Sequence, residues 1–399
     1  MGVELTGTRN RLTATLFVGA AFGSTGYVAA FTVASIAAAE ITSSAWVAGL
    51  PNACGILGTA AGTTLFANWR RGRRPSLATG YVSSVAGGLA AVAGLGLGNL
   101  ALLLVGSLVL GLGQASNQLS RYVAADMFPA ERRGQAIGWV VWAGTAGSVV
   151  GPRLIEPAGR AAEGLGLPLL AGGFATAATF MAVSLLIALA GLRPDPQTLA
   201  VDLVIEKGKP TGMFANRQVV GALAALITGQ AVMVLVMTAT PLHLTVGGHS
   251  LHQVGVVISA HTFGMFAFSP LTGRLADRVG MLPMLFTGLG LLGGSSLAAA
   301  LAPNGSTLLT FALFFLGLGW NFGFVAASAL LTSAVDPAVR SAVQGRVDSL
   351  VWISSAVASM LSGLTLQAGG YQQVGYIGLA GVVVGGWAFL RSRRAPAYV

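Results

Sequence analysis

Long apolar stretches follow one another along almost the whole chain, and short runs of polar, glycine and proline residues separate them. A bilayer core is about 30 Å thick, so a helix needs roughly 20 apolar residues to cross it. The first stretch is longer than the apolar region of a signal peptide, so we expect it to remain as the first span. The pattern predicts twelve membrane-spanning helices, at residues 12–38, 43–67, 75–97, 99–125, 135–158, 166–192, 217–244, 251–273, 281–302, 306–334, 341–367 and 371–390.

The composition also indicates a membrane environment. Of the 399 residues, 54% are hydrophobic and 9% are charged, whereas a soluble domain carries roughly 25% charged residues. A cytosolic enzyme and a nucleic-acid-binding protein are therefore excluded, and the lipid bilayer is the expected surrounding. The single cysteine, Cys54, excludes an internal disulfide and any cysteine-based zinc or iron–sulfur centre.

The positive charges indicate how the chain is oriented. The net charge is +10, and arginine and lysine gather in every second connection between spans, beginning at the N-terminus. The other connections hold only Arg153 and Arg160. Since cytoplasmic loops carry the excess of lysine and arginine, we expect both termini to lie in the cytoplasm.

The longest polar stretch lies in the middle of the chain and separates six predicted spans from six. We interpret residues 193–216 as a cytoplasmic linker between an N-terminal six-helix bundle, residues 1–192, and a C-terminal one, residues 217–399. The bundles repeat each other at an offset of 208 residues, which places Gly72 over Gly280. Duplicated halves are typical of membrane transporters. The predicted fold is an all-α integral membrane protein with twelve transmembrane helices in two repeated bundles.

A loop motif connects this architecture to a known family. The run Gly273-Arg274-Leu275-Ala276-Asp277-Arg278-Val279-Gly280, between the eighth and ninth spans, resembles the G-x-L-A-D-R-x-G loop of the major facilitator superfamily. The matching loop of the first half departs from the pattern, because Trp69 stands at the acidic position. The G-x-x-x-G-P sequence from Gly147 to Pro152 also resembles the fifth helix of that family. The resemblance implies two six-helix bundles around a central cavity that opens to alternate sides of the membrane.

Sulfur and imidazole, and not carboxylates, occupy the middle of the predicted spans. Met233 and Met237 are four residues apart in the seventh span, and His261 and Met265 are four apart in the eighth, so each pair shares one helix face. Thioether sulfur is a soft, neutral ligand that selects Cu(I), and imidazole also binds copper. The spacing therefore predicts a copper site of these four residues, although methionine is also a common filler in helix packing.

The two pairs resemble the M-x-x-x-M and H-x-x-x-M motifs of the CcoA-like copper importers within the same superfamily. The resemblance implies that Met233, Met237, His261 and Met265 bind copper as the transported substrate, with no resident cofactor. It also implies import through the inner membrane of a bacterium, with copper chaperones downstream. The copper would supply the assembly of the cbb3-type cytochrome c oxidase.

Other soft or titratable side chains surround the predicted site. Cys54 lies in the second span, where it is either an additional copper ligand or a small apolar filler. Three histidines flank the connection between the seventh and eighth spans. They form either a vestibule that collects metal or an ordinary loop that contains histidine: His243, His249 and His252.

The charges of the cytoplasmic loops have a separate predicted role. Asp277, Arg278 and Arg340 lie too far from the sulfur ligands to touch the ion, so we expect them to set the balance between inward-facing and outward-facing states. We interpret Arg121 and Asp348, near the inner ends of their spans, as interface anchors. The amide and indole side chains within the spans either line the cavity or join helices by hydrogen bonds: Asn52, Asn117, Gln118, Gln230, Trp320 and Asn321.

The predicted function is copper import by alternating access. The runner-up is a superfamily exporter of a drug or small metabolite, in which the methionines form an adaptable apolar wall. A membrane receptor or assembly factor that transports nothing is a third interpretation. An enzyme is the least favoured class, because no nucleophile with a base and no carboxylate-based metal motif lies within the spans.

Overall fold

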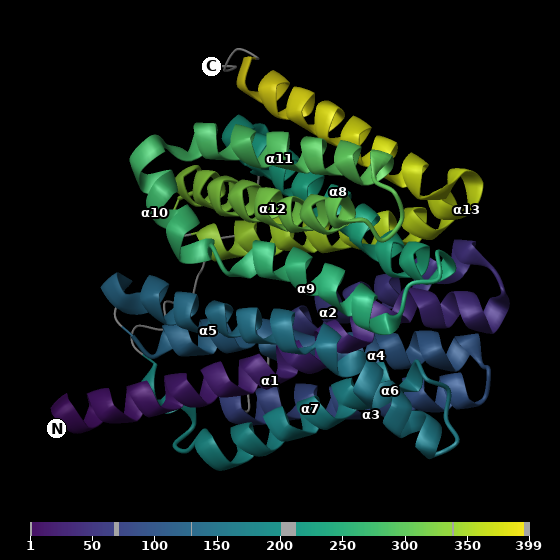
Figure 1. The fold of residues 1–399 in the computed structure, drawn as a ribbon. Helices are drawn as coiled ribbons and strands as arrows, with labels where there is room; N and C mark the ends of the chain where they lie inside the picture. Colours follow the sequence, from purple (N-terminus) through teal and green to yellow (C-terminus); the bar gives the residue numbers. More distant parts are fainter. Residues whose placement is uncertain (1, 68–71, 129, 201–212, 337–338, 395–399) are drawn as a thin grey trace.

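The computed structural model describes residues 2–67, 72–128, 130–200, 213–336 and 339–394, and within them the chain is helical and contains no strand. Most helices run side by side along one direction (Figure 1). The first helix begins and the last helix ends at the same end of the bundle, which we name the termini end. The opposite end, where α1 meets η1, is named the far end.

Two halves of the chain pack against each other, the first below and the second above in Figure 1. The N-terminal half contains α1 (Gly2–Thr42), the 3-10 turn η1 (Ala45–Gly49), α2 (Leu50–Ala67), α3 (Arg73–Gly96), α4 (Leu100–Asp126), α5 (Ala130–Val150), the 3-10 turn η2 (Pro152–Leu154), α6 (Ile155–Gly164) and α7 (Ala171–Gly191). The connection contains η3 (Pro196–Leu199) and η4 (Met213–Ala215). The C-terminal half contains α8 (Arg217–Val246), α9 (Leu251–Phe266), α10 (Ser269–Val279), α11 (Met281–Leu301), α12 (Thr307–Ser333) and α13 (Arg340–Arg394).

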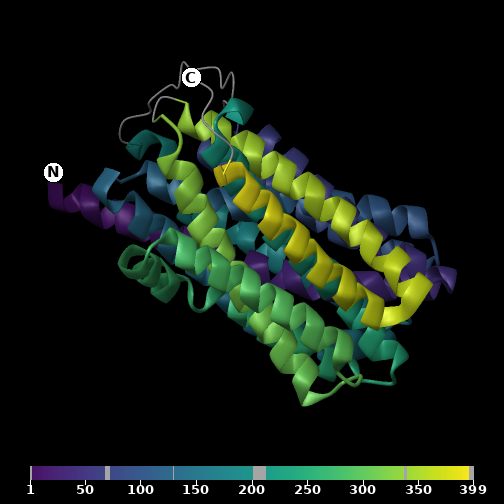
Figure 2. The ribbon, with the colours of Figure 1, turned by 90° about the horizontal axis from the view of Figure 1, so that it is seen from above.

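Nine helices of the described chain are long and apolar enough to cross a membrane, with α9 and α10 taken together. The helices α2 and α5 are not among the nine, and α13 counts once although it turns back on itself (Figure 2). The turn lies at Gly370, whose φ of 70° interrupts the helix. With α2, α5 and the second part of α13, the segments number twelve and follow the predicted order. The predicted all-α fold is confirmed.

The span expected at residues 135–158 is not one helix. The helix α5 ends at Val150, and Pro152 opens the short turn η2 before α6 begins. Proline has no backbone N–H and so cannot continue the hydrogen-bond ladder of α5. The predicted boundary is therefore wrong here, because hydropathy alone does not register the missing donor.

The span expected at residues 251–273 also breaks, after Phe266. Pro270 lies in the first turn of α10, where proline fits because that turn needs no backbone donor. The side-chain amide of Asn321 donates to the Met265 carbonyl at 2.7 Å and to the Ser269 hydroxyl at 2.7 Å. It thereby satisfies one of the carbonyl groups that a helix end leaves unpaired.

The internal repeat has a counterpart in the backbone. Gly72 precedes α3 with φ 106° and ψ 162°, and Gly280 precedes α11 with φ 91° and ψ 158°. Only glycine adopts this combination readily, so the repeat pairs two turns of the same shape. In the first half the Asp195 carboxylate accepts hydrogen bonds from the backbone N–H groups of Arg73 and Arg74, at 3.1 and 3.0 Å. An acidic residue of the connection thus caps α3.

At the far end the two halves touch through backbone atoms. A Cβ on Gly49 would collide with the carbonyl of Ser359 in α13, and one on Gly363 would lie 2.6 Å from the carbonyl oxygen of Trp46. The Ser359 hydroxyl donates to the Gly49 carbonyl at 2.9 Å, and the backbone N–H of Trp46 donates to the side-chain oxygen of Gln367 at 2.8 Å. These contacts hold the far ends of the halves together.

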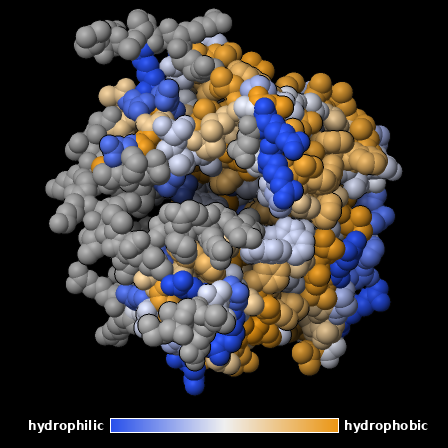
Figure 3. Space-filling view, turned by 90° about the vertical axis from the view of Figure 1, so that its left-hand side faces the viewer, coloured by the Kyte–Doolittle hydropathy of each residue, from blue (hydrophilic) through white to orange (hydrophobic). Residues whose placement is uncertain are grey.

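A second contact of the same kind joins the end of α5 to α9. A Cβ on Gly255 would lie 2.5 Å from the Pro152 carbonyl oxygen, and the Ser259 hydroxyl donates to the Val149 carbonyl at 3.4 Å. The termini end, by contrast, shows a recess that hydrophilic and hydrophobic side chains border together (Figure 3). The described residues therefore show close contacts between the halves at the far end and a recess at the termini end.

We expect Gly49→Ala to loosen the far end, because the new Cβ has no room beside the Ser359 carbonyl. Ser44→Cys in a Cys54→Ser background places a single thiol at this end. Its labelling by a charged maleimide should rise by about fivefold when Gly49→Ala is added, as a modest shift between two states produces. Gly290→Ala is the control, because its Cβ meets nothing within 4 Å. Equal labelling of the Gly49→Ala and Gly290→Ala variants would contradict the close contact between Gly49 and Ser359.

Candidate functional site

A cavity of about 220 Å³ lies between the two halves. The helices α1, α2, α4 and α5 line it from one side, and α8, α9 and α13 line it from the other. Its wall combines rings, polar groups and thioethers. The lining side chains that matter below are Tyr27, Phe31, Phe266 and Trp352 among the aromatic residues, Gln114, Asn117, Gln118, Arg121 and Gln230 among the polar ones, and Met233, Met237 and Met265 among the thioethers.

Three of the four predicted copper ligands meet at this cavity. Met233 and Met237 line it from α8, and Met265 lines it from α9. All three side chains are buried. Thioethers in such a place either bind a soft metal ion or form an adaptable apolar wall. The shared face predicted for the two methionines of α8 therefore points into a cavity.

His261, the fourth predicted ligand, lies elsewhere. Its side chain is fully buried and is not among the residues that line the central cavity. Its Nδ1 lies 2.8 Å from the Leu313 carbonyl of α12, and because a carbonyl only accepts, Nδ1 carries the proton. Nε2 is buried without a hydrogen-bond partner among the described residues. Gly317 permits this contact, since a Cβ there would collide with the His261 carbonyl.

Of the predicted accessory ligands, His243 and His249 lie near enough to interact electrostatically, while Cys54 lies apart on α2. The ring of His243 stacks on that of Tyr371, with centroids 4.1 Å apart, and His249 packs against Gly305. His252 is exposed. Cys54 is half-buried and does not line the central cavity. No group of three or more His, Cys, Asp or Glu side chains is arranged to hold a metal ion within the part of the chain that the structure describes.

The predicted gating residues are only partly visible. The side chains of Asp277 and Arg340 lie outside the described residues, and Arg278 is exposed at the end of α10. Their role in setting the conformational balance stays a prediction.

Arg121 has a different place from the one expected. It lines the central cavity, and its guanidinium lies 4.8 Å from the centre of the Tyr122 ring. The carboxylate of Asp348, on α13 in the other half, interacts with it electrostatically. The cation in the cavity wall is thus partly balanced by an anion from the opposite half.

The amide groups of the cavity are oriented by their neighbours. The indole N–H of Trp320 donates to the side-chain oxygen of Gln230 at 2.7 Å, which leaves the amide nitrogen of Gln230 for the cavity. In the other half, the hydroxyl of Tyr81 donates to the oxygen of Asn117 at 3.2 Å, and the nitrogen of Asn117 donates to the oxygen of Gln114 at 3.3 Å. Each network occupies one acceptor position of an amide oxygen and leaves amide N–H donors at the cavity in both halves.

One pattern in the sequence marks this polar wall. Gln114, Asn117, Gln118 and Arg121 are spaced by three, one and three residues on α4, so they form a stripe along one face. On an otherwise apolar membrane helix, such a stripe faces the protein interior. Roles were predicted for Asn117, Gln118 and Arg121, but the stripe that they form with Gln114 was not predicted. Asn52 and Asn321 lie away from this cavity, where Asn321 joins α9, α10 and α12.

The whole chain matches one family. The sequence model of the Major Facilitator Superfamily covers residues 15–250 and again residues 221–398. The chain belongs to the major facilitator superfamily. Membership makes it a multi-pass membrane transporter and not an enzyme. The resemblance inferred from the loop motif is confirmed at this level, and the finer assignment to copper importers stays a prediction.

Relatives within the superfamily are similar over most of their length. The chain is 34% identical over 364 residues to the uncharacterized MFS-type transporter YddS of Bacillus subtilis (strain 168), covering 88% of this chain and 83% of the relative. It is 31% identical over 330 residues to the riboflavin transporter RfnT of Brucella anthropi, covering 80% of each.

Solved structures show the same fold at lower identity. A D-xylose-proton symporter matches with a TM-score of 0.73 and 20% identity, over 94% of this chain and 96% of the symporter. A POT family transporter in complex with 5-aminolevulinic acid matches with a TM-score of 0.74 and 11% identity, over 96% of both chains. At these identities the likeness concerns the fold alone.

We expect Gly317→Ala to weaken the packing of α9 on α12, because its Cβ would collide with the His261 carbonyl. Overpacking of this kind costs about 1–3 kcal/mol, so the unfolding temperature of the purified protein should fall by several degrees. Gly323→Ala on the same helix is the matched control, since its Cβ meets nothing within 4 Å. If both variants unfold at the temperature of the wild type, the close contact is not present.

Proposed function

We propose that this transporter carries a neutral, planar heteroaromatic solute of the flavin type through its central cavity by alternating access. The observation that carries the proposal is the pair of amide side chains, Gln114 and Gln230, that line a cavity with aromatic walls from opposite halves. A flavin ring has carbonyl oxygens and ring nitrogens that accept hydrogen bonds. It also has flat faces that stack on rings such as those of Phe266 and Trp352.

The cavity wall combines a positive side chain with an acidic neighbour. Arg121 lines the cavity, and Asp348 of the other half interacts with it electrostatically, an arrangement that fits a solute without net charge. A cavity that offers hydrogen-bond donors repels a bare cation unless other groups coordinate it. The riboflavin transporter RfnT, at 31% identity over 80% of this chain, supports the same class of solute.

Copper is the second candidate, because three thioethers share the cavity. Met233, Met237 and Met265 supply soft, neutral sulfur ligands from two helices. His261 would complete the set only after its side chain leaves the Leu313 carbonyl, to which its Nδ1 is bonded. Copper chaperones and oxidase assembly enter the proposal only with this candidate. For either solute, no resident cofactor is required.

Membrane orientation completes the proposal. Arginine side chains gather at the termini end, on α1 and α3 and at the end of α10. Since positive loops stay in the cytoplasm, we place both termini there and the protein in the inner membrane of a bacterium. The described conformation then opens to the cytoplasm.

The first test is uptake of radiolabelled riboflavin into cells or proteoliposomes that contain the transporter. We expect Gln230→Leu to raise the half-saturating riboflavin concentration by about tenfold, because a buried hydrogen bond is lost and Trp320 loses its acceptor. Gln218→Leu, an exposed glutamine at the start of the same helix, should leave uptake unchanged. No riboflavin transport by the wild type would refute the flavin proposal.

A single substitution separates the two candidates. Leucine keeps the volume and apolarity of methionine but removes the sulfur, so Met237→Leu abolishes only ligation. Under the flavin proposal we expect riboflavin uptake within about twofold of the wild type, since such swaps disturb packing little. Radiolabelled copper uptake by the wild type that disappears in Met237→Leu would instead establish the copper candidate.

A further inference from the structure

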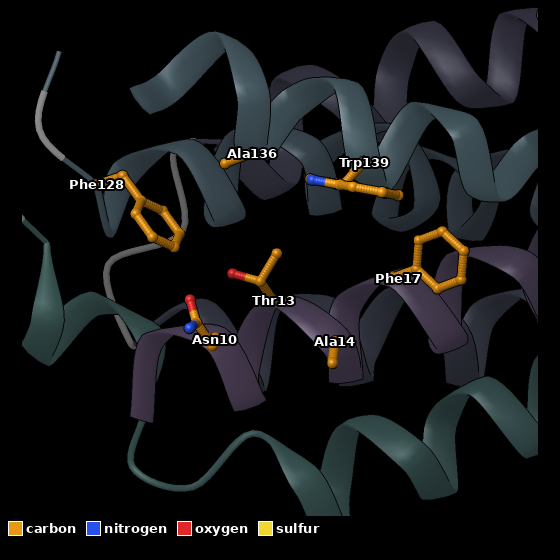
Figure 4. Close-up of a pocket in the computed structure, with 7 residues that line it drawn as sticks. All are labelled: Asn10, Thr13, Ala14, Phe17, Phe128, Ala136 and Trp139. Atoms are coloured by element: carbon orange, nitrogen blue, oxygen red, sulfur yellow. The ribbon is translucent and has the colours of Figure 1, made fainter. Parts of the chain in front are cut away.

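A second cavity opens at the termini end, with a volume of about 440 Å³. Cavities of this size accommodate small organic ligands. Figure 4 shows side chains of α1 pointing up toward side chains of α5 and of the end of α4. We name it the mouth cavity. Its lining residues are Asn10, Thr13, Ala14, Phe17, Phe128, Ala136 and Trp139.

The mouth cavity continues the central cavity along α1. Asn10, Thr13 and Phe17 line the mouth cavity, and the next residues on the same face of the helix, Ser24 and Tyr27, line the central cavity. These five residues follow one another at intervals of three, four, seven and three positions, so they lie along one stripe of the helix. The two cavities thus lie on one path through the N-terminal half.

The same continuity holds on α5. Ala136 and Trp139 line the mouth cavity, while Val140 and Gly144 line the central one. Both cavities therefore lie along α1 and α5, and the mouth cavity lies nearer the termini end.

The mouth cavity is aromatic on one side and polar on another. Trp139 is 55% exposed although it lies in a concave site, and its ring makes an edge contact with Trp142 at a centroid distance of 6.4 Å. Phe17 stacks on Trp142 at 6.2 Å. Asn10 and Thr13 point from α1 toward α5, which carries Trp139 (Figure 4). The rings fix one another, and the exposed face of Trp139 is left for a ligand.

We propose that the mouth cavity is a second binding site for the transported planar heteroaromatic solute. The solute stacks on Trp139 and reaches the amide of Asn10 with a polar edge, before or after it occupies the central cavity. The inference rests on the proposed function for its class of solute, but it assigns a separate site. Stacking of a ring on an indole contributes affinity without requiring a buried charge. Such an interaction suits a binding site on the transport path, which must release its ligand again.

The test uses the full chain in lipid nanodiscs with riboflavin as the probe. Flavin fluorescence is quenched when the ring stacks on an indole, so a titration reports each stacked site. We expect two binding phases in the wild type. Trp139→Leu should weaken one phase by about tenfold, as the loss of an aromatic pair does, and leave the other unchanged. Trp139→Phe keeps a ring and should restore most of the weakened phase.

Two further variants complete the design. Gln230→Leu should weaken the phase that Trp139→Leu spares, because it alters the central cavity. Trp387→Leu is the matched control, since this tryptophan is 59% exposed on α13 and lies outside both cavities. Each variant is first compared with the wild type by gel filtration, so that a folding defect is recognised.

The outcomes separate the two proposals. A single phase that depends on Gln230 alone, or two phases that ignore Trp139→Leu, overturns the mouth site and leaves the proposed function standing; Trp139 is then an anchor at the membrane interface. No binding of riboflavin to the wild type overturns the proposed function and the mouth site together. Two phases of which Trp139 controls one establish the second site.

Discussion

The contact of Gly49 with the carbonyl of Ser359 determines which way the transporter opens. Two backbones approach this closely only where a glycine leaves out its side chain, and Gly363 and Gly255 repeat the arrangement on either side. The Ser359 hydroxyl then donates to the Gly49 carbonyl, so a buried acceptor is satisfied by the other half. With the far ends held in this way, both cavities lie between these contacts and the termini end.

The polarity of the cavity wall matters for binding, because a solute that enters the cavity replaces its hydrogen bonds to water with contacts to the side chains of the wall. The amide groups of the wall are held in place by their neighbours. Trp320 donates to the oxygen of Gln230, and the chain from Tyr81 through Asn117 donates to the oxygen of Gln114. Hydrogen bonds within the protein thus orient these amides and determine which of their donor and acceptor positions remain for a solute.

The sequence predicted the path of the chain better than its bends. Long apolar runs specify spans because a bilayer permits few alternatives, and the repeat is confirmed by the matching backbone of Gly72 and Gly280. Hydropathy averaged over a span does not register a single missing N–H, so the breaks near Pro152 and Pro270 were not predicted. The two methionines of α8 were placed on one face correctly, since helical spacing alone decides that.

The case of His261 shows where sequence reasoning about a site stops. Spacing places it on the face of α9 that carries Met265, but a face is wide enough to meet two different neighbours. Gly317 lets α12 come so close that its Leu313 carbonyl binds Nδ1, while Met265, one turn along, still reaches the cavity. Arg121 is the opposite case. Its charge predicted a position at the membrane interface, but it lines the central cavity, and Asp348, with which it interacts, lies 227 residues away in the sequence. Contacts between helices that are far apart in the sequence, within one half for His261 and between the halves for Arg121, therefore decide the role of each side chain.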